Sequence, residues 1–396
     1  MPRSYAPNVE RFDVIVVGAG PAGSVTAHLL AREGVRTLLV DRARFPRDKP
    51  CGGGVTLRGA RLLPFAIGPV VERQISTIAF RHPTLGSFAH GGLAPVVLMT
   101  QRLRLDAFLA EQAVLAGAAF RDGVRLRTVE FEDDGRPAVT FDDGSRAGAG
   151  VLIAADGANG VCGRSLQLGE GRIFAPALEA NVAYDAVGAG VEQDVALLEM
   201  GYVPGGYGWL FPKGDHANVG VGGWDSQGPH LREHLRRVCD RHRIEWSALT
   251  EVRGHRLPMR GSATRIANGR ALAVGDAAGL VDPLSGDGMY EAFTSAHVAS
   301  ACARDVLDGR SSDLSAYPAR LDAALGRHTS LAWIAKAAIE RAPSLALRVA
   351  RSNAIRRPFL QRTATSRDPL TRVAPNPVWR QAERVARRLL GPEAGS

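Results

Sequence analysis

Cysteine is scarce in this sequence, and its four residues lie far apart. They form no Cys-x-x-Cys pair and have no close histidine partner, which excludes a disulfide scaffold and a zinc ribbon. Their spacing fits a protein of a reducing compartment. The four positions are Cys51, Cys162, Cys239 and Cys302.

A long apolar run is also absent. The most apolar early stretch, Val14 to Leu30, is interrupted by three glycines and a proline and has no basic segment before it. It therefore has the character of neither a signal peptide nor a transmembrane helix, which needs about 20 continuous apolar residues. We expect a cytoplasmic protein, and attachment to the inner face of a membrane remains open.

Lysine is the third scarcity: 3 lysines accompany 46 arginines, a ratio that a codon preference of the genome explains. The net charge of +9 lies in the last 56 residues, where 12 arginines stand against three acidic residues. Residues 1–340 are therefore neutral and carry no basic stripe, so we expect no nucleic-acid partner. The basic tail favours an anionic membrane surface instead.

Apolar residues and glycine are abundant in the sequence. Its 396 residues are 45% hydrophobic and include 45 glycines without a collagen period. This composition predicts a large, turn-rich α/β protein with one big domain or two to three ordinary ones.

The first forty residues carry a nucleotide-binding pattern. A β-branched strand over Phe12–Val17 leads into Gly18, Gly20 and Gly23, and a helix follows over Ser24–Glu33. The glycines permit the tight turn, the approach of a pyrophosphate and close packing of helix on strand. A second strand over Val35–Val40 ends at Asp41, which is placed to bind a ribose.

Further motifs resemble those of the geranylgeranyl reductase family of FAD-dependent oxidoreductases, whose fold is like that of para-hydroxybenzoate hydroxylase. They are Lys49–Gly54, Arg102–Asp106, Ala155–Asn159 with Arg164 after it, Gly275–Gly279 and Gly286–Met289. Gly160 stands where the family more often has serine. The resemblance makes FAD the expected cofactor.

The cofactor residues follow from these motifs. A buried strand over Arg270–Val274 would place Asp276 at the ribityl chain, and Gly286–Gly288 would open a helix toward the flavin N1 edge. The expected cofactor-binding residues are Gly18, Gly20, Gly23, Asp41, Arg42, Arg102, Asp156, Gly275, Asp276, Gly286, Gly288 and Met289. No second glycine-rich unit offers an NAD(P) domain, so the electron donor is NAD(P)H that visits transiently or a reduced protein such as ferredoxin.

The implied architecture is an FAD-binding Rossmann-like domain with an interleaved antiparallel-sheet substrate domain and a helical C-terminal region. We assign 1–74, 98–172 and 259–300 to the FAD-binding domain, and 75–97 and 173–258 to the substrate domain. Residues 301–396 form the basic C-terminal region, with helices over Phe293–Val306 and Leu331–Arg341.

Aromatic residues alternate in the segment from Pro204 to Pro212. Tyr207, Trp209 and Phe211 would share one face of a strand, either as an ordinary core contact or as the wall of an apolar cavity. The string resembles the Pro-x-x-Tyr-x-Trp-x-Phe-Pro signature of geranylgeranyl reductases, which favours the wall. With Lys49 and Gly53, these three aromatics are the expected substrate-binding residues.

The resemblance implies hydride transfer from reduced flavin N5 to a double bond of a polyprenyl chain, with a proton delivered to the other carbon. Cys51 is one candidate for the proton donor. Its alternative role is that of a buried, small apolar side chain. Tyr207 is the other candidate for the proton donor. Its alternative role is that of a cavity residue whose hydroxyl is hydrogen-bonded and takes no part in the reaction. The rival functions are an aromatic monooxygenase or halogenase, for which Lys49 is the suggestive residue, and a membrane-bound electron-transfer flavoprotein.

Two further patterns concern helices. Val378–Leu390 places Trp379 and other apolar residues on one arc and Arg380, Arg384, Arg387 and Arg388 on the opposite arc. This favours an anionic bilayer surface, and a helix packed on the protein is the alternative. His230, His234 and His242 lie in an Arg-rich stretch that we interpret as a solvated helix face rather than a metal site.

Overall fold

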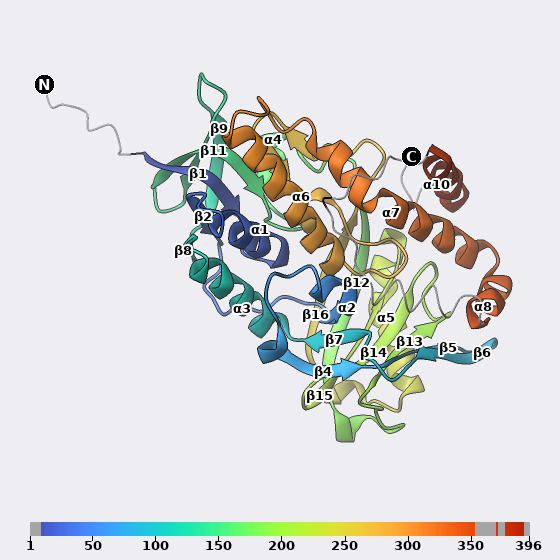
Figure 1. The fold of residues 1–396 in the computed structure, drawn as a ribbon. Helices are drawn as coiled ribbons and strands as arrows, with labels where there is room; N and C mark the ends of the chain where they lie inside the picture. Colours follow the sequence, from blue (N-terminus) through green and yellow to red (C-terminus); the bar gives the residue numbers. More distant parts are fainter. Residues whose placement is uncertain (1–8, 353–369, 371–376, 392–396) are drawn as a thin grey trace, which may run out of the picture.

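Two large sheets of different construction form the body of the protein, whose structure is a computed structural model that describes residues 9–352, 370 and 377–391. Figure 1 shows β1, β2 and α1 at one end of the molecule and β5, β6 and α8 at the other. The mixed α/β architecture predicted from the sequence is confirmed.

The first sheet is the nucleotide-binding one. Its central strands run in the order β18-β11-β1-β2-β8 and are parallel, and the second half of β1, from Val14 to Val17, is buried. Its strands are β1 Glu10–Val17, β2 Thr37–Val40, β8 Ala119–Arg121, β9 Leu126–Phe131, β10 Pro137–Phe141, β11 Arg146–Ala154, β17 Ala267–Asn268 and β18 Ala271–Ala273.

Three helices pack in this part: α1 Pro21–Ala31, α3 Arg102–Leu115 and α6 Met289–Leu307. α1 begins at Pro21, three residues before the predicted start, because the fixed φ of proline suits the first helical turn and its missing N–H would have no partner there. The second strand begins at Thr37 rather than Val35, after the turn that ends α1.

The second sheet carries the predicted substrate residues. Its order is β16-β12-β15-β14-β13-β5-β6, and every pairing is antiparallel except that of β13 with β5. Its strands are β5 Thr77–His82, β6 Gly86–Gly91, β12 Ile173–Ala183, β13 Val195–Met200, β14 Tyr207–Pro212, β15 His216–Gly222 and β16 Thr250–Met259. A smaller sheet joins β3 Gly54–Thr56, β7 Val97–Thr100 and β4 Val71–Ile75.

Helix α5, Leu231–Arg241, packs on the second sheet and corrects one prediction. His234 on α5 and His242, directly after the end of α5, do not lie on a solvated face, because both side chains are buried. Nε2 of His242 lies 2.9 Å from Oε1 of the equally buried Glu199, and Nε2 of His234 lies 3.1 Å from Gln227 Oε1. Both histidines are structural, whereas His230 is exposed.

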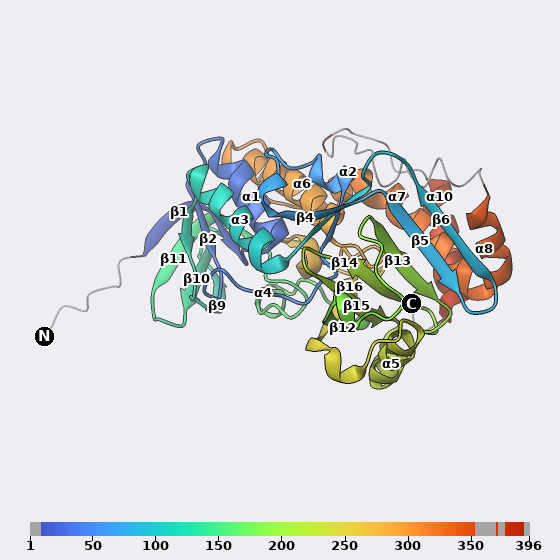
Figure 2. The ribbon, with the colours of Figure 1, turned by 90° about the horizontal axis from the view of Figure 1, so that it is seen from below.

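The C-terminal helices are α7 Tyr317–Arg341, α8 Pro343–Arg351 and α10 Pro377–Leu390. Figure 2 shows α7, α8 and α10 gathered at the end of the molecule where β5 and β6 lie. α7 starts fourteen residues before the predicted Leu331. Residues 353–369, 371–376 and 392–396 of the predicted basic region, with four of its prolines, lie outside the described residues.

α10 packs against α7. A helix packed on the protein is the second of the two interpretations that its amphipathic pattern allowed. Its Ala386 is buried, and Arg387, predicted on the solvated arc, lies instead over the Trp333 ring at 4.1 Å from the ring centre. Val378, Val385 and Leu389 stay exposed. Only part of the apolar arc therefore packs on the protein.

The remaining elements are short: α2 Leu57–Ala60 and α4 Cys162–Leu166, with 3-10 turns at Gly68–Val70, Tyr184–Ala186, Asp225–His230, Trp246–Ala248 and Gly275–Ala278. Among the described helices, none combines the length and apolarity that a membrane span needs.

Candidate active site

A long cavity of about 1030 Å³ runs between the two large sheets. One end lies at the start of α1 and the other at α8, and its lining includes almost every site residue that the sequence predicts. Gly23 is the exception, because it packs behind the glycine turn.

The glycine turn after β1 leaves no room for side chains. Gly18 has φ of +107°, and a Cβ there would lie 2.3 Å from the Ala155 carbonyl oxygen. A Cβ on Gly23 would lie 1.8 Å from the carbonyl oxygen of Gly18. These contacts bring α1 tight against the strand, so its free N-terminal amides face the cavity as a site for phosphate oxygens.

Asp41 ends β2 beside this turn, as predicted. Its Oδ2 accepts the Ala19 N–H at 2.8 Å and its Oδ1 accepts the Ala43 N–H at 2.9 Å. A carboxylate has further lone pairs, so Asp41 can both shape the turn and accept a ribose hydroxyl. Arg42 lines the same end of the cavity and is exposed.

Two guanidinium groups stand over the turn, and the sequence predicted only one of them. Arg102 donates twice to the fully buried Asp106, with both distances 2.6 Å, and Arg47 Nη1 lies 2.7 Å from the same carboxylate. A Cβ on Gly20 would lie 3.6 Å from Arg47 Nη2 and 3.9 Å from Arg102 Nη2. Asp106 thus orients two cations toward the pyrophosphate position.

Arg47 was missed because it belongs to no motif. It follows the turn after Asp41, and only the folded chain brings it back to Asp106. A search for basic residues between Asp41 and Lys49 would have found it as one of three arginines.

The unusual Gly160 has a local explanation. A Cβ at position 160 would lie 2.1 Å from the Asp156 carboxyl carbon, whose Oδ2 accepts the Cys162 N–H at 2.8 Å. Because Asp156 folds back over this turn, the position cannot hold the serine that is common in the family.

Asp276 and Lys49 meet in the middle of the cavity. Lys49 Nζ donates to Asp276 Oδ2 at 2.9 Å, and His255 Nε2 lies 3.8 Å from the same oxygen. Burial alone would raise the pKa of Asp276, but Lys49 and His255 outweigh it and hold the pKa well below its usual range. The carboxylate is therefore ionised and able to accept hydrogen bonds from a ribityl chain.

Gly286, Gly288 and Met289 form the loop that opens α6, as predicted. Gly286 has φ of +66°, and a Cβ there would lie 3.2 Å from the Tyr207 hydroxyl. Between the two glycines, Asp287 accepts the Met289 N–H at 2.8 Å. Burial raises the pKa of Asp287 to about 7, and Glu291 adds to this rise.

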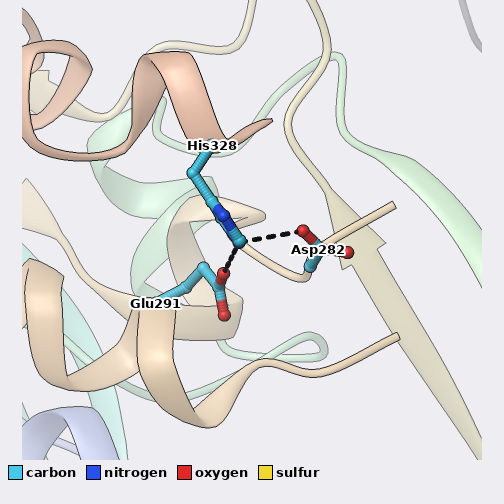
Figure 3. A group of neighbouring side chains, drawn as sticks. All are labelled: Asp282, Glu291 and His328. Carbon is cyan, nitrogen blue, oxygen red and sulfur yellow. Dashed lines mark ion pairs between the residues drawn. The ribbon is translucent and has the colours of Figure 1, made fainter. Parts of the chain in front are cut away.

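Behind this loop lies a group of charged side chains, Asp282, Glu291 and His328 (Figure 3). His328 Nε2 is 3.1 Å from a carboxylate oxygen of each acid. Their ligand atoms lie close enough to hold a metal ion, but the Arg58 guanidinium lies 3.1 to 3.2 Å from both ring nitrogens of His328. With that cation in place, we assign an ion-pair network that ties α7 to the loop.

The Cys51 loop lines the same cavity as Gly286–Met289. The Cys51 N–H donates to Glu179 Oε1 at 2.8 Å, and a Cβ on Gly52 would lie 3.1 Å from the Phe211 ring. Cys51 is partly exposed, whereas the other three cysteines are buried. Glycine therefore lets this loop pack directly on the aromatic wall.

The predicted aromatic wall is present on β14. Tyr207, Trp209 and Phe211 all line the cavity, with 6.1 Å between the ring centres of each neighbouring pair. Trp209 Nε1 donates to Asn218 at 2.8 Å. The Tyr207 hydroxyl donates to the Ser285 carbonyl, and burial raises the pKa of Tyr207, with Asp287 and Asp282 adding to the rise.

Beyond the aromatic wall the cavity continues as an arm that no sequence motif predicts. The arm is lined from β5, β6, β13, α7 and α8 by apolar side chains, except for His90, whose Nε2 lies 2.7 Å from the Ala350 carbonyl oxygen. Representative lining residues are Phe80, Phe88, Leu198, Ala338, Ile339 and Leu347.

The α1 end fits FAD on its own geometry. It combines a glycine cradle that side chains would fill, two guanidiniums at the helix N-terminus and a carboxylate at the end of β2. The ionised Asp276 lies further along the same cavity. This order matches the adenosine, pyrophosphate and ribityl parts of the cofactor.

Comparison with known proteins agrees with this geometry. Residues 11–324 match the family model of an FAD binding domain. The menaquinone reductase of Mycolicibacterium smegmatis is 32% identical over 96% of this chain and 98% of its own. The chloroplastic geranylgeranyl diphosphate reductase of Oryza sativa subsp. japonica is 32% identical over 80% of this chain and 72% of its own.

Solved structures share the fold at lower identity. A geranylgeranyl bacteriochlorophyll reductase-like protein from Thermoplasma acidophilum has a TM-score of 0.75 at 22% identity and covers 98% of each chain. The flavin-dependent brominase Bmp2 has a TM-score of 0.73 at 17% identity, over 96% of this chain and 99% of its own. The cavity, the family match and the relatives together establish that the chain belongs to the geranylgeranyl reductase family of FAD-dependent oxidoreductases.

Proposed function

We propose that this FAD-dependent oxidoreductase saturates carbon–carbon double bonds of a polyprenyl chain. The observation that carries the proposal is the apolar arm, which continues the cofactor cavity past the aromatic wall and ends at α8. A long hydrocarbon fills such an arm without leaving a buried polar group unpaired. The names of the relatives, reductases of menaquinone and of geranylgeranyl diphosphate, support the same substrate class.

When bound, FAD supplies hydride from the reduced flavin N5. The protein has to keep water out of the arm, hold the alkene in place and deliver a proton to the second carbon. Cys51 suits the last task, because this residue is partly exposed, lines the cavity and precedes Gly52, which packs on the aromatic wall. The alternative role of Cys51 is that of a small apolar side chain in the cavity wall.

Tyr207 is the second candidate donor, and its surroundings favour the other role. Its hydroxyl already donates to the Ser285 carbonyl, and its raised pKa makes it a weaker acid. We therefore propose that Tyr207 fixes the Gly286–Met289 loop, while Trp209, Phe211, Lys49 and Gly53 shape the substrate side. Lys49 pairs with Asp276, so it is a cofactor-side residue as well.

An anaerobic experiment tests the reaction. The purified flavoprotein is reduced with dithionite and mixed with geranylgeranyl diphosphate or a polyprenyl quinone. We expect flavin reoxidation together with a product whose mass rises in steps of two hydrogens. Reoxidation by dioxygen alone, with an oxygenated or halogenated aromatic product, would support the monooxygenase or halogenase. Electron transfer to an acceptor without any altered substrate would support the electron-transfer flavoprotein.

Two substitutions separate the candidate donors. Cys51→Ala should retain FAD and be reduced normally by dithionite, yet lose reoxidation by the alkene. Tyr207→Phe should retain part of the turnover and bind FAD more weakly, since the loop loses its tie to β14. Full alkene turnover in Cys51→Ala would remove the proton-donor role. The physiological electron donor, NAD(P)H or a reduced protein such as ferredoxin, is identified by which of the two reduces the wild type.

We also propose that the protein takes its substrate from an anionic membrane surface. Val349 of α8 lines the cavity and is half exposed, so the arm reaches the surface at this helix. Leu345 beside it is exposed, and Arg348 and Arg351 follow on the same helix. Exposed leucine and valine next to arginine suit a bilayer with anionic headgroups. The exposed side of α10 adds to this surface.

A further inference from the structure

A buried lysine lies beneath the Cys51 loop, and neither the motifs nor the proposed roles use it. Lys213 follows β14 directly and is only 2% exposed. Its Nζ donates to the carbonyl of Gly52 and, at 3.0 Å, to the carbonyl of Thr100. A Cβ on Gly53 would lie 2.3 Å from that nitrogen, so the ammonium packs directly against the loop.

The backbone of Lys213 is held as firmly as its side chain. Its N–H donates to the His216 carbonyl at 2.8 Å, while its own carbonyl accepts from Arg73 Nε at 2.9 Å and from the Tyr184 hydroxyl. The ammonium is therefore fixed in place rather than carried by a mobile surface side chain. Such fixed positioning is what a charge needs to act at one defined atom.

The cost of burying this cation is not offset by an ion pair. Within the described residues, no carboxylate oxygen lies within 4.0 Å of Nζ, and two carbonyls use two of its three N–H donors. Burial lowers the pKa of Lys213 to about 8, although Cys51, Glu179 and Glu72 act in the opposite direction. A buried, unpaired lysine beside a partly exposed cysteine marks a functional position rather than a stabilising one.

We infer that Lys213 is a positioning residue that holds the Cys51 loop and stabilises the negative charge left on Cys51 when its thiol gives up a proton. This rests on the proposed function. The S–H bond of Cys51 breaks, its proton forms the C–H bond at one alkene carbon, and the electron pair stays on sulfur as thiolate. The other carbon receives the hydride that the reduced cofactor supplies, so the alkene gains two electrons and two hydrogens. A proton taken up from bulk solvent then converts the thiolate back to the thiol.

Glu179 completes the arrangement from the other side. It is buried, and its carboxylate accepts the Cys51 N–H, whereas Lys213 holds the carbonyl of the next residue. Glu179 lies on β12 of the second sheet and Lys213 directly follows β14 of that sheet, whereas the loop leads into β3 of the smaller sheet. The position of Cys51 is thus set by the same sheet that carries the aromatic wall.

The rate of alkylation of Cys51 tests whether Lys213 stabilises the Cys51 thiolate, and the assay needs no catalytic turnover. The full-length protein is treated with iodoacetamide at pH 7, and labelling is located by peptide mass spectrometry, which is clean because the other cysteines are buried. Because the thiolate is the reactive form, Lys213→Met should slow the labelling of Cys51 by about tenfold. Lys213→Arg, which keeps the charge, should stay close to wild type. Lys336→Met, which removes a second largely buried lysine, is the matched control and should not change the rate.

The direction of the change distinguishes the two roles of Lys213. If the lysine only braced the loop, Lys213→Met would expose Cys51 and speed its labelling. A faster or unchanged rate therefore overturns the inference. Should Cys51→Ala retain full alkene turnover, the proton donor of the proposed function fails, while slower labelling in Lys213→Met still establishes the charge effect.

Discussion

The two ends of the cavity hold their ligands by opposite means. At the α1 end, charged side chains are paired and aimed by a few short contacts, such as those of Asp106 with Arg102 and Arg47. At the α8 end, apolar side chains from five elements supply shape and almost no polarity. One end is built for a charged dinucleotide and the other for a hydrocarbon, so substitutions should affect the two ligands separately.

The largest effect should come from the charged end. Asp106→Asn leaves two inward-facing guanidiniums without their shared counterion, and breaking a buried charge pair in this way costs about 3–5 kcal/mol. We expect a protein that purifies without FAD and has a lower free energy of unfolding, measured by denaturant titration and flavin absorbance.

The control for this variant lies on the same helix. Arg104 is half exposed, lies 3.5 Å from Glu72 and does not line the cavity. Arg104→Met should keep FAD and most of the stability. Normal flavin content in Asp106→Asn would show that the paired guanidiniums do not hold the pyrophosphate.

The next effect should appear at the apolar end alone. Ala338→Trp fills the arm from α7, and since burial of one methylene contributes about 0.8 kcal/mol, loss of room for one isoprene unit should weaken binding by about 10² to 10³-fold. Affinity for geranylgeranyl diphosphate, measured by flavin fluorescence, should fall while FAD content stays normal.

Chain length sharpens this test. A geranyl substrate, which is too short to reach the filled part of the arm, should bind wild type and Ala338→Trp alike. Equal affinity of the two proteins for the long chain would mean that the arm is not where the polyprenyl chain lies.

The sequence predicted the α1 end of the cavity better than the α8 end, for a physical reason. The residues of the α1 end form short sequence motifs, because turns such as Gly18–Gly23 need glycine at fixed spacing to bind a phosphate. The aromatic wall was predictable for the same reason, since strand geometry places alternate residues on one face. Arg47 and Lys213 were missed because each acts on a residue far away in the chain.

The apolar arm could not be predicted at all. Residues such as Phe80 and Ala338 belong to segments more than 250 positions apart, and alanine or leucine in a helix has the same pattern whether it lines a cavity or fills a core. The same ambiguity affected α10, whose amphipathic pattern suits both a bilayer and α7. In the structure Ala386 and Arg387 pack on the protein, while Val385 and Leu389 stay exposed.

Membrane binding at the apolar end should be a smaller, graded effect. Each basic residue near an anionic surface contributes about 1 kcal/mol, so Arg348→Glu should lower binding to phosphatidylglycerol vesicles by roughly fivefold or more. Leu345→Asp should act in the same direction, as measured by flotation.

Leu115→Asp is the matched control, because Leu115 is 73% exposed on α3, at the cofactor end. It should leave flotation unchanged. If Leu345→Asp and Leu115→Asp float equally well, α8 is not the membrane contact, and Leu389→Asp then tests α10 in its place.

The smallest effect concerns Asp287, which lies in the middle of the cavity where the two ends meet. Glu291 and Asp282 raise its pKa beyond the effect of burial, and Arg58 opposes them. Because the folded pKa of about 7 exceeds the unfolded value near 3.9, the folded state binds this proton more tightly. The resulting stabilisation is fully present below about pH 4 and is lost as the pH rises through 7.

We therefore expect the melting temperature of the protein to fall between pH 6 and pH 8 by more in the wild type than in Asp287→Asn. The difference corresponds to about 1 kcal/mol, or on the order of 2 °C. His328, whose pKa the neighbouring acids raise against the effect of burial, titrates in the same direction in both proteins. It therefore cancels in the comparison. Parallel pH profiles of the two proteins would mean that Asp287 is ionised throughout, and that the cavity is charged up to the aromatic wall.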